Sequence, residues 1–407
     1  MNVPADVCIV GGGPAGMMLG LLLARQGAGV TVLEKHKDFL RDFRGDTVHP
    51  STLDVLDELG LGPAAAAVPH RDVSELRTTF SDGTYRVADF GRLRVGHPYI
   101  RFMPQSDFLD LLADAAGALP TFRLLRSHEA VGLIESGGVV RGVRAQGPEG
   151  PVEVRAALTV AADGRNSILR RHSGLPSRNY GAPMDVLWFR LRRSPDAAEG
   201  LDMHFGAGRV ILGIDRGDYW QVAYVIAKGG DAKVRAAGLA DLRRQVAALV
   251  PGLAAEVEQL QDWDQVRTLT VRLDRLRRWH APGLLCIGDA AHAMSPIGGV
   301  GINLAIQDAV CAARMLARPL RNQTLNSRTL ASIQRRRWFP TAGTQLLQRV
   351  AQRFLVSPML ASSKPSKAPP PLRLLARHPR LQALPARIIG VGLLPEKVQG
   401  LTPGRGA

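Results

Sequence analysis

Apolar and polar positions come in blocks at the start of the chain, and the block lengths predict a parallel α/β fold. Residues 5–10, "ADVCIV", form an apolar run typical of a buried strand, and residues 15–26 have the pattern of a helix that Gly27 can end. Residues 29–35, "GVTVLEK", predict the next strand. A strand, a helix and a strand within about 30 residues make a βαβ unit, so we expect these two strands to be parallel.

The pattern changes further along the chain. Between residues 177 and 273, runs such as "MDVLWFRLRR" and "DYWQVAYVIAKG" are β-rich, with one helix expected at 240–249. "GLLCIGDAAHAM" then predicts another buried strand, and "GINLAIQDAVCAARMLA" a long helix. After Trp338, helical stretches surround "SSKPSKAPPP", which predicts a mobile or extended linker. The sequence therefore predicts an α/β domain with a β-rich insertion and a helical C-terminal segment.

Composition narrows the range of partners. The 407 residues are 45% hydrophobic and 22% charged, which is typical of a globular protein, but the net charge is +16. The sequence has no nucleic-acid-binding motif and no basic stripe with interleaved aromatic residues, so we expect no nucleic-acid partner. The charge favours polyanionic small molecules such as dinucleotides, with an anionic membrane surface as the minor alternative.

Cysteine usage and hydropathy exclude other classes. Cys8, Cys286 and Cys311 are too far apart in sequence for a metal cluster, and the first two lie in strand-like runs, so we expect small buried side chains and no metal site. The chain has no secretory n-region and no run of about 18 uncharged apolar residues. We therefore expect a cytoplasmic protein without a transmembrane segment.

The first motif is "GGGPAG", between the first strand and the first helix. Gly11, Gly13 and Gly16 satisfy G-x-G-x-x-G, in which the glycines permit a tight turn, close approach to a pyrophosphate and close strand–helix packing. The helix N-terminus then offers N–H groups and a partial positive charge to phosphates. An acidic residue that ends the second strand can accept ribose hydroxyls. The motif predicts an adenine dinucleotide, either FAD or NAD, held by Gly11, Gly13, Pro14, Ala15, Gly16, Glu34 and Lys35.

The second motif is "GDAAHAMSPIGGVGIN". Asp289 follows a strand, where a carboxylate can hold a sugar-alcohol hydroxyl such as one on the ribityl chain of a flavin. The glycines that follow suggest close backbone approach, and the next helix N-terminus could stabilise negative charge at the pyrimidine edge of a flavin. The alternative is a purely structural turn with Asp289 as a cap. The cofactor contacts expected here are Asp289, Pro296, Gly299, Gly301, Ile302 and Asn303.

The third motif is "ADGRNSILR", in which Asp163 follows another strand end. One interpretation is a turn that serves the dinucleotide and recruits a nicotinamide cofactor through its arginines. The alternative is an Asp-Gly turn followed by a solvated helix face. Because the chain also carries two other dinucleotide motifs, we favour the first interpretation, with Asp163 as a cofactor contact.

In order and spacing, these three motifs resemble those of the p-hydroxybenzoate hydroxylase-like FAD monooxygenases, over about residues 3–340. The resemblance implies that Arg44 and Gln105 also contact the flavin cofactor. It implies a Rossmann-like FAD-binding domain with an inserted β-sheet-rich substrate domain. We expect the FAD domain at 1–75, 101–176 and 274–340, the substrate domain at 76–100 and 177–273, and the helical C-terminal segment at 341–407.

The resemblance also implies a reaction. In that family, NADPH or NADH reduces bound FAD, and O₂ then forms a C4a-hydroperoxide on the flavin. An electron-rich ring of the substrate gains a hydroxyl from it. The protein positions the reactants, excludes water and supplies electrostatic stabilisation. We expect an aromatic, phenolic or polyketide-like substrate, and a monomer or homodimer. No acid or base can be assigned; the weak candidates are His49, Tyr219 and Tyr224.

Three other functions stay open at this stage. One is a flavin-dependent reductase or oxidase of the same fold, acting on an isoprenoid or quinone-type substrate. Another is a plain nicotinamide-binding Rossmann protein, which would leave the second motif without a purpose. The last is a peripheral-membrane quinone hydroxylase, suggested by the basic charge and the apolar stretch "IIGVGLLP".

Overall fold

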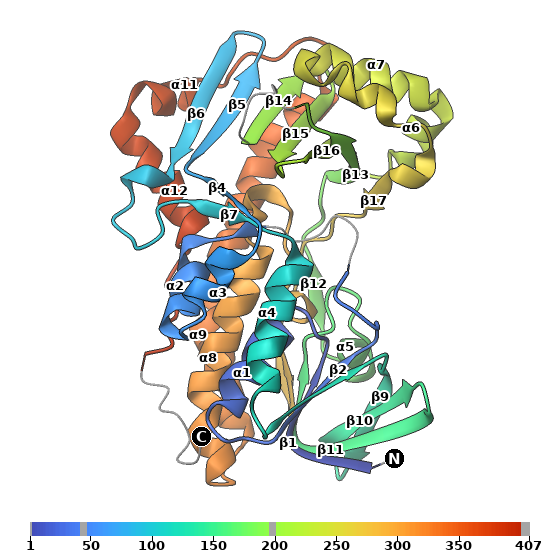
Figure 1. Ribbon diagram of the computed structural model, residues 1–407, viewed down its shortest axis with the longest axis vertical. Coiled ribbons are helices and arrows are strands. Elements are labelled where there is room, and N and C mark those ends of the chain that lie inside the picture. Colours follow the sequence, from blue (N-terminus) through green and yellow to red (C-terminus); the bar gives the residue numbers. More distant parts are fainter. Residues whose placement is uncertain (1, 41–46, 195–200, 400–407) are drawn as a thin grey trace.

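Two sheets form the framework, one above the other along the long axis of the molecule (Figure 1). The computed structural model describes residues 2–40, 47–194 and 201–399. One sheet lies in the lower half of Figure 1 and the other in the upper half, and long helices run beside the lower sheet towards the upper one.

The lower sheet has eight strands and carries the predicted βαβ unit. Its main path is β19-β20-β11-β1-β2-β8, and β10 and β9 extend it from β11. The pairs β11–β1, β1–β2, β2–β8 and β11–β20 are parallel, which confirms the expected sheet type. The strands are β1 (Asn2–Val10), β2 (Val30–Glu34), β8 (Phe122–Arg126), β9 (Glu129–Ser136), β10 (Val139–Gly147), β11 (Gly150–Ala161), β19 (His280–Ala281) and β20 (Leu284–Cys286).

Helices cover one face of this sheet and bury its apolar residues. All residues of α1 from Ala15 to Ala24 are buried, because this helix lies between the sheet and the other helices of the layer. Cys8, Cys286 and Cys311 are buried free thiols, which confirms the burial predicted for the first two. The layer consists of α1 (Pro14–Ala24), α4 (Gln105–Gly117), α8 (Gly301–Arg321) and α9 (Ser327–Ala351), and α5 (Ile168–His172) lies against β9.

The upper sheet has seven strands in the order β17-β13-β16-β15-β14-β5-β6. The hairpin β5–β6 precedes the rest by more than 90 residues in sequence, yet it joins the sheet through parallel pairing of β5 with β14. The strands are β5 (Glu75–Phe80), β6 (Gly83–Asp89), β13 (Met184–Arg192), β14 (Leu201–Gly206), β15 (Arg209–Asp215), β16 (Tyr219–Ala227) and β17 (Arg267–Leu269).

Strand alternation gives the upper sheet two distinct faces. One face, which includes Leu187, Val222 and Tyr224, packs on the helices α6 (Asp231–Ala237) and α7 (Leu239–Leu249). The opposite face, which includes Trp188 and Leu212, packs towards the lower half of the molecule and contacts Ile297 and Ile389. The predicted limits of the inserted domain remain a prediction, but this second face is where the two halves meet.

Short strands and helices connect the two halves. They are β3 (Thr47–Val48), β4 (Arg71–Val73) and β7 (Ile100–Phe102), the pair β12 (Ser177–Asn179) and β18 (Asp274–Leu276), and the helices α2 (Pro50–Glu58) and α3 (Gly62–Ala67).

The C-terminal segment bridges both halves. Helix α9 continues through Pro340, across the boundary expected at 340, and leads through a π-helical turn, η7 (Gln352–Val356), into α10 (Ser357–Ala361). The extended linker after α10 lies on the tip of the β5–β6 hairpin, where Ser81 donates its N–H to the Ser366 carbonyl at 3.1 Å and Ala368 donates its N–H to Asp82 at 3.0 Å. After α11 (Pro370–Arg377) and α12 (Ala383–Gly390), the chain returns to α8 and α9, where Glu396 pairs with Arg314 and Arg336.

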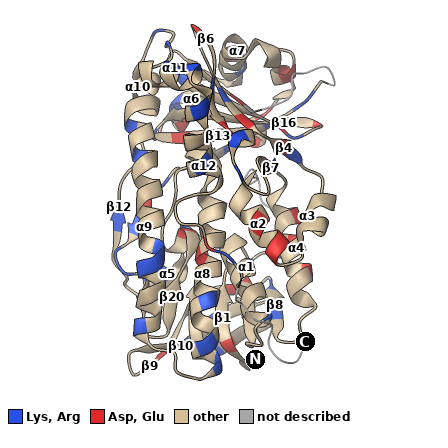
Figure 2. Ribbon diagram, turned by 90° about the vertical axis from the view of Figure 1, so that its left-hand side faces the viewer, with Lys and Arg blue, Asp and Glu red and all other residues tan. Residues whose placement is uncertain are grey.

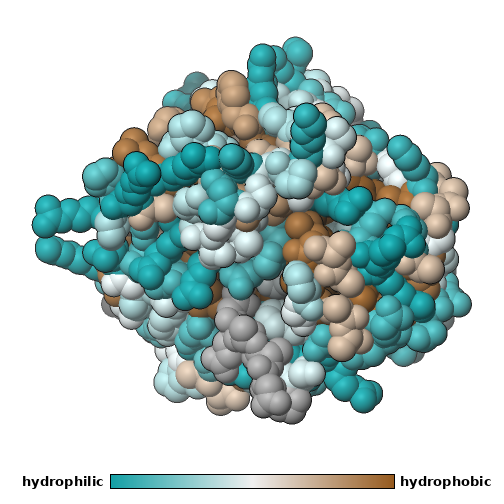
Figure 3. All heavy atoms as spheres, turned by 90° about the horizontal axis from the view of Figure 1, so that it is seen from above, coloured by the Kyte–Doolittle hydropathy of each residue, from teal (hydrophilic) through white to brown (hydrophobic). Residues whose placement is uncertain are grey.

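One described helical segment, Ile297–Arg321, is long and apolar enough to cross a membrane, but 72% of its apolar 18-residue window is buried inside the protein. A buried core helix passes the same test, so this segment is no evidence for a membrane span. Figure 3 views the end of the molecule that carries the upper sheet, where the surface is mostly hydrophilic with separate apolar patches.

Candidate functional site

Three adjacent parallel strands of the lower sheet end at the same edge. Val10 pairs with Ala161 and Ala161 pairs with Cys286, so the three predicted motifs begin side by side. Backbone hydrogen bonds join them beyond the strands, because Ala162 donates its N–H to the Val10 carbonyl at 2.8 Å and Ile287 donates to the Ala161 carbonyl at 3.0 Å. The carboxyl edge of a parallel sheet is where ligands bind in doubly wound folds.

The three glycines of the first motif are explained by different physical requirements. A Cβ on Gly11 would lie 2.3 Å from the Ala162 carbonyl oxygen, and Gly11 also has a φ of +105°. A Cβ on Gly16 would lie 2.0 Å from the Gly11 carbonyl oxygen, so this glycine lets α1 pack on the end of β1. A Cβ on Gly13 would meet no described atom within 4 Å. Since the fold does not require a glycine at position 13, we attribute it to the space that a ligand needs.

The predicted residues around this turn occupy the same edge of the sheet. Glu34 ends β2 and is 6% exposed, and its carboxylate accepts the N–H groups of Gly12 and His36, both at 2.9 Å. Pro14 opens α1 and no described side chain caps that helix, which leaves its first N–H groups to a ligand. Lys35 follows β2 and is exposed. Arg44 lies outside the described residues.

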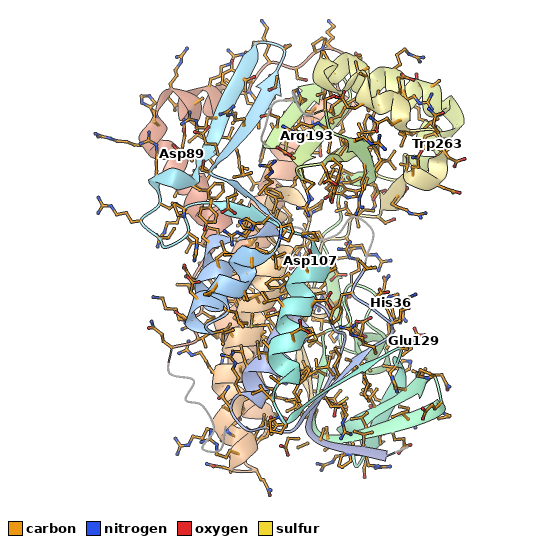
Figure 4. The ribbon with its side chains drawn as sticks, viewed as in Figure 1. His36, Asp89, Asp107, Glu129, Arg193 and Trp263 are labelled. Carbon is orange, nitrogen blue, oxygen red and sulfur yellow. The ribbon has the colours of Figure 1, made fainter. Side chains whose placement is uncertain are left out.

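Gln105 is the first residue of α4 and is half-buried. Figure 4 labels Asp107 in the same helical turn, at the level where the two halves of the molecule meet. Gln105 therefore begins its helix close to the junction of the two sheets.

Two carboxylates follow the other two strand ends. Asp163 accepts the N–H of Ile168 at 2.8 Å through Oδ2, while its buried Oδ1 has no hydrogen-bond partner among the described residues. Burial raises the pKa of Asp163, and a hydrogen bond from Ser167 partly opposes this shift. Asp289 lies in a 3₁₀ turn, η5 (Gly288–Ala290), and pairs with Arg165 at 3.3 Å; both side chains are partly exposed. Each carboxylate can therefore accept a further hydrogen bond from a ligand.

A buried ion network holds the turn that carries Asp289. Asp308, on α8, accepts the Gly288 N–H at 3.0 Å and contacts His292 at 2.6 Å and Arg337 at 2.9 Å. Burial alone would raise the pKa of Asp308, but His292 and Arg337 outweigh burial and hold it below its usual value. The carboxylate therefore stays charged and anchors the turn from below.

The glycine-rich loop lies between this turn and α8. It forms a short 3₁₀ turn, η6 (Ile297–Gly299), after Pro296, and both Gly298 and Gly299 have positive φ. Gly301 begins α8 and Ile302 follows it in the first turn. Thr47 donates to the Gly299 carbonyl at 2.9 Å, which ties the loop to β3.

Three buried glutamines, two at the end of α9 and one at the start of η7, hold the segment just before this loop. Gln345 donates to the Ala293 carbonyl at 3.2 Å, and Gln352 donates to the Ser295 hydroxyl at 2.9 Å. Between them, Gln348 donates to the carbonyls of Ser295 and Ile297 and accepts the Ser295 N–H. Sequence reasoning missed these residues. Their i, i+3, i+7 spacing was visible, but a glutamine on a helix is usually solvated.

Asn303 docks α8 against α2. Its side-chain oxygen accepts hydrogen bonds from the hydroxyls of Ser51 and Thr52, both at 2.8 Å. His49 caps α2 without a side-chain bond, is fully buried, and has no hydrogen-bond partner at either ring nitrogen within the described part of the chain. Burial lowers the pKa of His49 to about 4, so the imidazole is neutral at pH 7.

The two tyrosine candidates lie on opposite faces of the upper sheet. Tyr224 is buried beneath α7, donates its hydroxyl to Gln245 at 2.5 Å and has its pKa raised by burial. Tyr219 is half-buried at the start of β16, under the Arg190 guanidinium at 4.8 Å. Tyr224 therefore points away from the face that meets the lower half.

Trp188 is a residue that sequence reasoning missed. It lies on the face of the upper sheet that contacts Ile297 of the glycine-rich loop and Ile389 of α12. Its indole Nε1 is buried and has no partner in the described part of the structure. Buried indole N–H groups usually find an acceptor, so this one is available to a ligand. Strand alternation in "MDVLWFRLRR" could have assigned the face of Trp188 but not its neighbours.

These observations fit a bound FAD. Open space beside Gly13, an uncapped helix N-terminus and unpaired acceptor capacity on Asp163 lie along one edge of the sheet. A long dinucleotide can use all three: phosphates at the helix, and sugar or sugar-alcohol hydroxyls at the carboxylates. The glycine-rich loop and the N-terminus of α8 continue the same edge towards the upper sheet.

Comparison with known proteins agrees with an FAD site. The sequence matches the FAD binding domain family over residues 4–346. The 6-methylpretetramide 4-monooxygenase of Streptomyces rimosus is 34% identical over 385 residues, which cover 94% of this chain and 91% of that protein. The 12-dehydrotetracycline 5-monooxygenase/anhydrotetracycline 6-monooxygenase of Streptomyces rimosus subsp. rimosus is 30% identical over 75% of this chain and 61% of that protein.

A solved structure shows the same fold. The anhydrotetracycline hydroxylase of Streptomyces rimosus has a TM-score of 0.76 and 26% identity, covering 95% of this chain and 76% of that one. The family match spans most of the chain and the fold match nearly all of it, which confirms the resemblance stated from the motifs. The chain therefore belongs to the FAD binding domain family, and it is an FAD-dependent monooxygenase of the p-hydroxybenzoate hydroxylase-like class.

Proposed function

We propose that this enzyme hydroxylates an aromatic ring of a polycyclic, polyketide-like small molecule, with O₂ and NADPH or NADH as co-substrates. The observation that carries this proposal is the 34% identity along 94% of the chain to a protein named as a 6-methylpretetramide 4-monooxygenase. The similarity to an anhydrotetracycline hydroxylase supports the same substrate class. Both names describe multi-ring aromatic substrates.

We further propose the cofactor contacts. The backbone of Gly11 to Gly16 and the N-terminus of α1 hold the pyrophosphate, Glu34 accepts ribose hydroxyls, and Asp289 accepts a ribityl hydroxyl. The remaining contacts proposed from the motifs are Lys35, Arg44, Gln105, Asp163, Pro296, Gly299, Gly301, Ile302 and Asn303. When bound, FAD supplies the electron transfer and the activation of O₂, which no side chain can supply.

The protein's own residues position that chemistry. The glutamines of α9 fix the backbone before the glycine-rich loop, so the loop keeps one geometry beside the ring system. The N-terminus of α8, which no described side chain caps, would place a partial positive charge near a bound flavin. The upper sheet lies over this edge and would exclude water from the site when FAD is bound, which suppresses side reactions with solvent.

We propose that Trp188 and Leu212 form the substrate wall. Both lie on the face of the upper sheet that contacts the glycine-rich loop or its neighbours. A flat aromatic substrate can pack on their apolar surfaces, and the unpartnered indole N–H of Trp188 can donate to a phenol or ketone oxygen. His49 is a poor proton acceptor at pH 7 because its burial disfavours the charged form.

The experiment is a turnover assay on purified FAD-loaded enzyme. Polycyclic phenols, simple phenols and quinones are screened for substrate-stimulated NADPH and NADH consumption, and products are analysed by mass after reaction under ¹⁸O₂. We expect a polycyclic phenol to gain one labelled oxygen atom. A protein that binds FAD, yet transfers labelled oxygen to none of these rings while reducing a quinone or isoprenoid, would contradict the proposal.

A further inference from the structure

Three arginines converge on one tyrosine beside the C-terminal helices. Tyr180, just after β12, has the guanidinium carbons of Arg178, Arg275 and Arg349 over its ring at 5.3, 5.4 and 5.0 Å. Arg275 also donates to the Tyr180 hydroxyl at 2.8 Å. The arginines come from three separate elements, β12, β18 and α9, so the fold itself brings them together.

This cluster has no counter-charge in the described structure. Neither these three arginines nor the nearby Arg353 forms an ion pair with any described carboxylate; Arg275 is half-buried, and the other three side chains are exposed. Like charges at this separation repel one another, and partial burial of Arg275 together with Arg178 and Arg349 lowers its pKa. Figure 2 shows Lys and Arg gathered beside β12 and along α9, while acidic residues are concentrated on α2 and α4.

A surface pocket of about 470 Å³ adjoins the cluster. Tyr180, Arg349 and Arg353 line its basic part. Leu346, Val350 and Phe354 line its apolar part, and these side chains are 56%, 46% and 68% exposed. The pocket also includes Gln352, in the π-helical turn η7, a local geometry that is frequent at functional sites.

We propose that this pocket binds an apolar molecule that carries a phosphate or carboxylate group. Guanidinium groups bind such oxyanions through paired, charge-assisted hydrogen bonds, and an anion would relieve the repulsion among the arginines. The exposed apolar wall beside them suits a hydrophobic body attached to the anion. This second site goes beyond the proposed hydroxylation, because none of the residues that line it is among the proposed cofactor or substrate contacts.

The pocket is connected to the cofactor edge by hydrogen bonds. Arg275 donates to Gln345 at 3.1 Å, and Gln345 in turn donates to the carbonyls of Asp274 and Ala293. Gln352 lines the pocket and also holds the Ser295 hydroxyl. An anion at the arginines would therefore be linked, through Arg275 and Gln345, to the backbone ahead of the glycine-rich loop.

Calorimetry measures the binding of 1-naphthyl phosphate to the full-length, FAD-loaded enzyme. The test variant is Arg178→Gln combined with Arg349→Gln, both at exposed side chains whose loss leaves the core intact. The matched control is Arg335→Gln, the same change at an exposed arginine of α9 away from the pocket. We expect roughly tenfold weaker binding per arginine removed in the test variant. The control should bind as the wild type does.

Two further arms define the ligand. Phe354→Ala should weaken naphthyl phosphate but not inorganic phosphate, because it removes only apolar wall. Sedimentation with phosphatidylglycerol vesicles, against phosphatidylcholine vesicles, distinguishes a lipid headgroup from a free anion; arginine-dependent binding to phosphatidylglycerol alone would assign the site to the headgroup. Equal naphthyl phosphate and vesicle binding by the wild type, the test variant and Arg335→Gln would overturn the proposal. None of these measurements depends on turnover, so a failed hydroxylation assay leaves them interpretable.

Discussion

The Gln348 side-chain amide donates to the Ser295 carbonyl at 2.8 Å and accepts the Ser295 N–H at 3.1 Å. It thus pairs with Ser295 as a neighbouring strand would, although it belongs to a helix. The same amide donates to the Ile297 carbonyl at 2.9 Å, so one side chain satisfies three backbone groups. A buried polar group without a partner is costly, which makes this contact a structural requirement of the loop.

Replacing Gln348 by Ala should lower the free energy of unfolding by about 2 kcal/mol, because three backbone groups lose their partner. FAD affinity should fall as well, since the glycine-rich loop is no longer held. Urea unfolding and quenching of flavin fluorescence measure the two effects. Leu347→Ala, at the exposed neighbouring position, is the control. Unchanged FAD affinity in a destabilised Gln348→Ala protein would show that the hydrogen bonds of Gln348 serve the fold alone.

Gly13 and Gly16 should respond differently to the same change. Alanine at position 16 would collide with the Gly11 carbonyl and destabilise the fold, whereas alanine at position 13 meets no described atom. We expect Gly13→Ala to unfold like the wild type but to bind FAD roughly a hundredfold more weakly, which is about 2.7 kcal/mol. Thermal unfolding of the FAD-free protein and flavin titration separate these effects. Normal flavin affinity in Gly13→Ala would rule out pyrophosphate contact there.

Asp289→Ala should weaken FAD binding by about ten- to a hundredfold and leave stability within about 1 kcal/mol, because its ion pair with Arg165 is partly exposed. Arg165→Gln breaks the same pair but keeps the carboxylate, so it should retain most of the affinity. Equal losses of flavin affinity in the two variants would mean that the pair, and not the carboxylate, serves the cofactor.

His49 makes stability depend on pH. Its pKa falls from 6.5 to about 4 on folding, so the unfolded chain binds an extra proton between these values. The free energy of unfolding should therefore decrease as pH falls from about 6.5 to about 4, by up to about 3 kcal/mol from this group. His49→Leu should lack that part of the decrease. Urea titrations at several pH values measure it, and parallel pH curves for both proteins would contradict the assignment.

Trp188→Phe removes the indole N–H but keeps an aromatic wall. If the N–H donates to a substrate oxygen, KM for a hydroxylated substrate should rise roughly five- to tenfold with a smaller effect on kcat. Trp263→Phe is the control, because Trp263 lies against Arg235 at the outer side of the upper half (Figure 4). An unchanged KM in Trp188→Phe would remove this contact from the proposed substrate site.

Local sequence signals predicted much of the cofactor edge. The alternation of strand and helix blocks predicted the parallel sheet, because an apolar strand and a glycine-rich turn have a recognisable short-range pattern. The positions of Gly11, Asp163 and Asp289 just after strand ends followed from the motifs, and these ends belong to three adjacent strands, β1, β11 and β20. These features depend on residues close together in the chain, which is the range that sequence patterns describe well.

Contacts between distant segments could not be predicted in this way. Gln348 looks like a surface residue of α9 until Ser295 is placed against it, 53 positions earlier in the chain. The pairing of β5 with β14 and the packing of Trp188 and Ile297 in one apolar cluster depend on how the two sheets meet. Helix α9 runs through Pro340, and Arg337 and Thr341 on either side of it are buried against the rest of the fold.

The chain crosses between the two sheets repeatedly, and its last segment joins the β5–β6 hairpin near Ser366 before it returns to α8 and α9 at Glu396. Neither half is thus a continuous stretch of polypeptide. A protease that nicks one connection would leave the others intact, so the fragments should still elute as a single species from a sizing column. They should come apart only when denaturant is added.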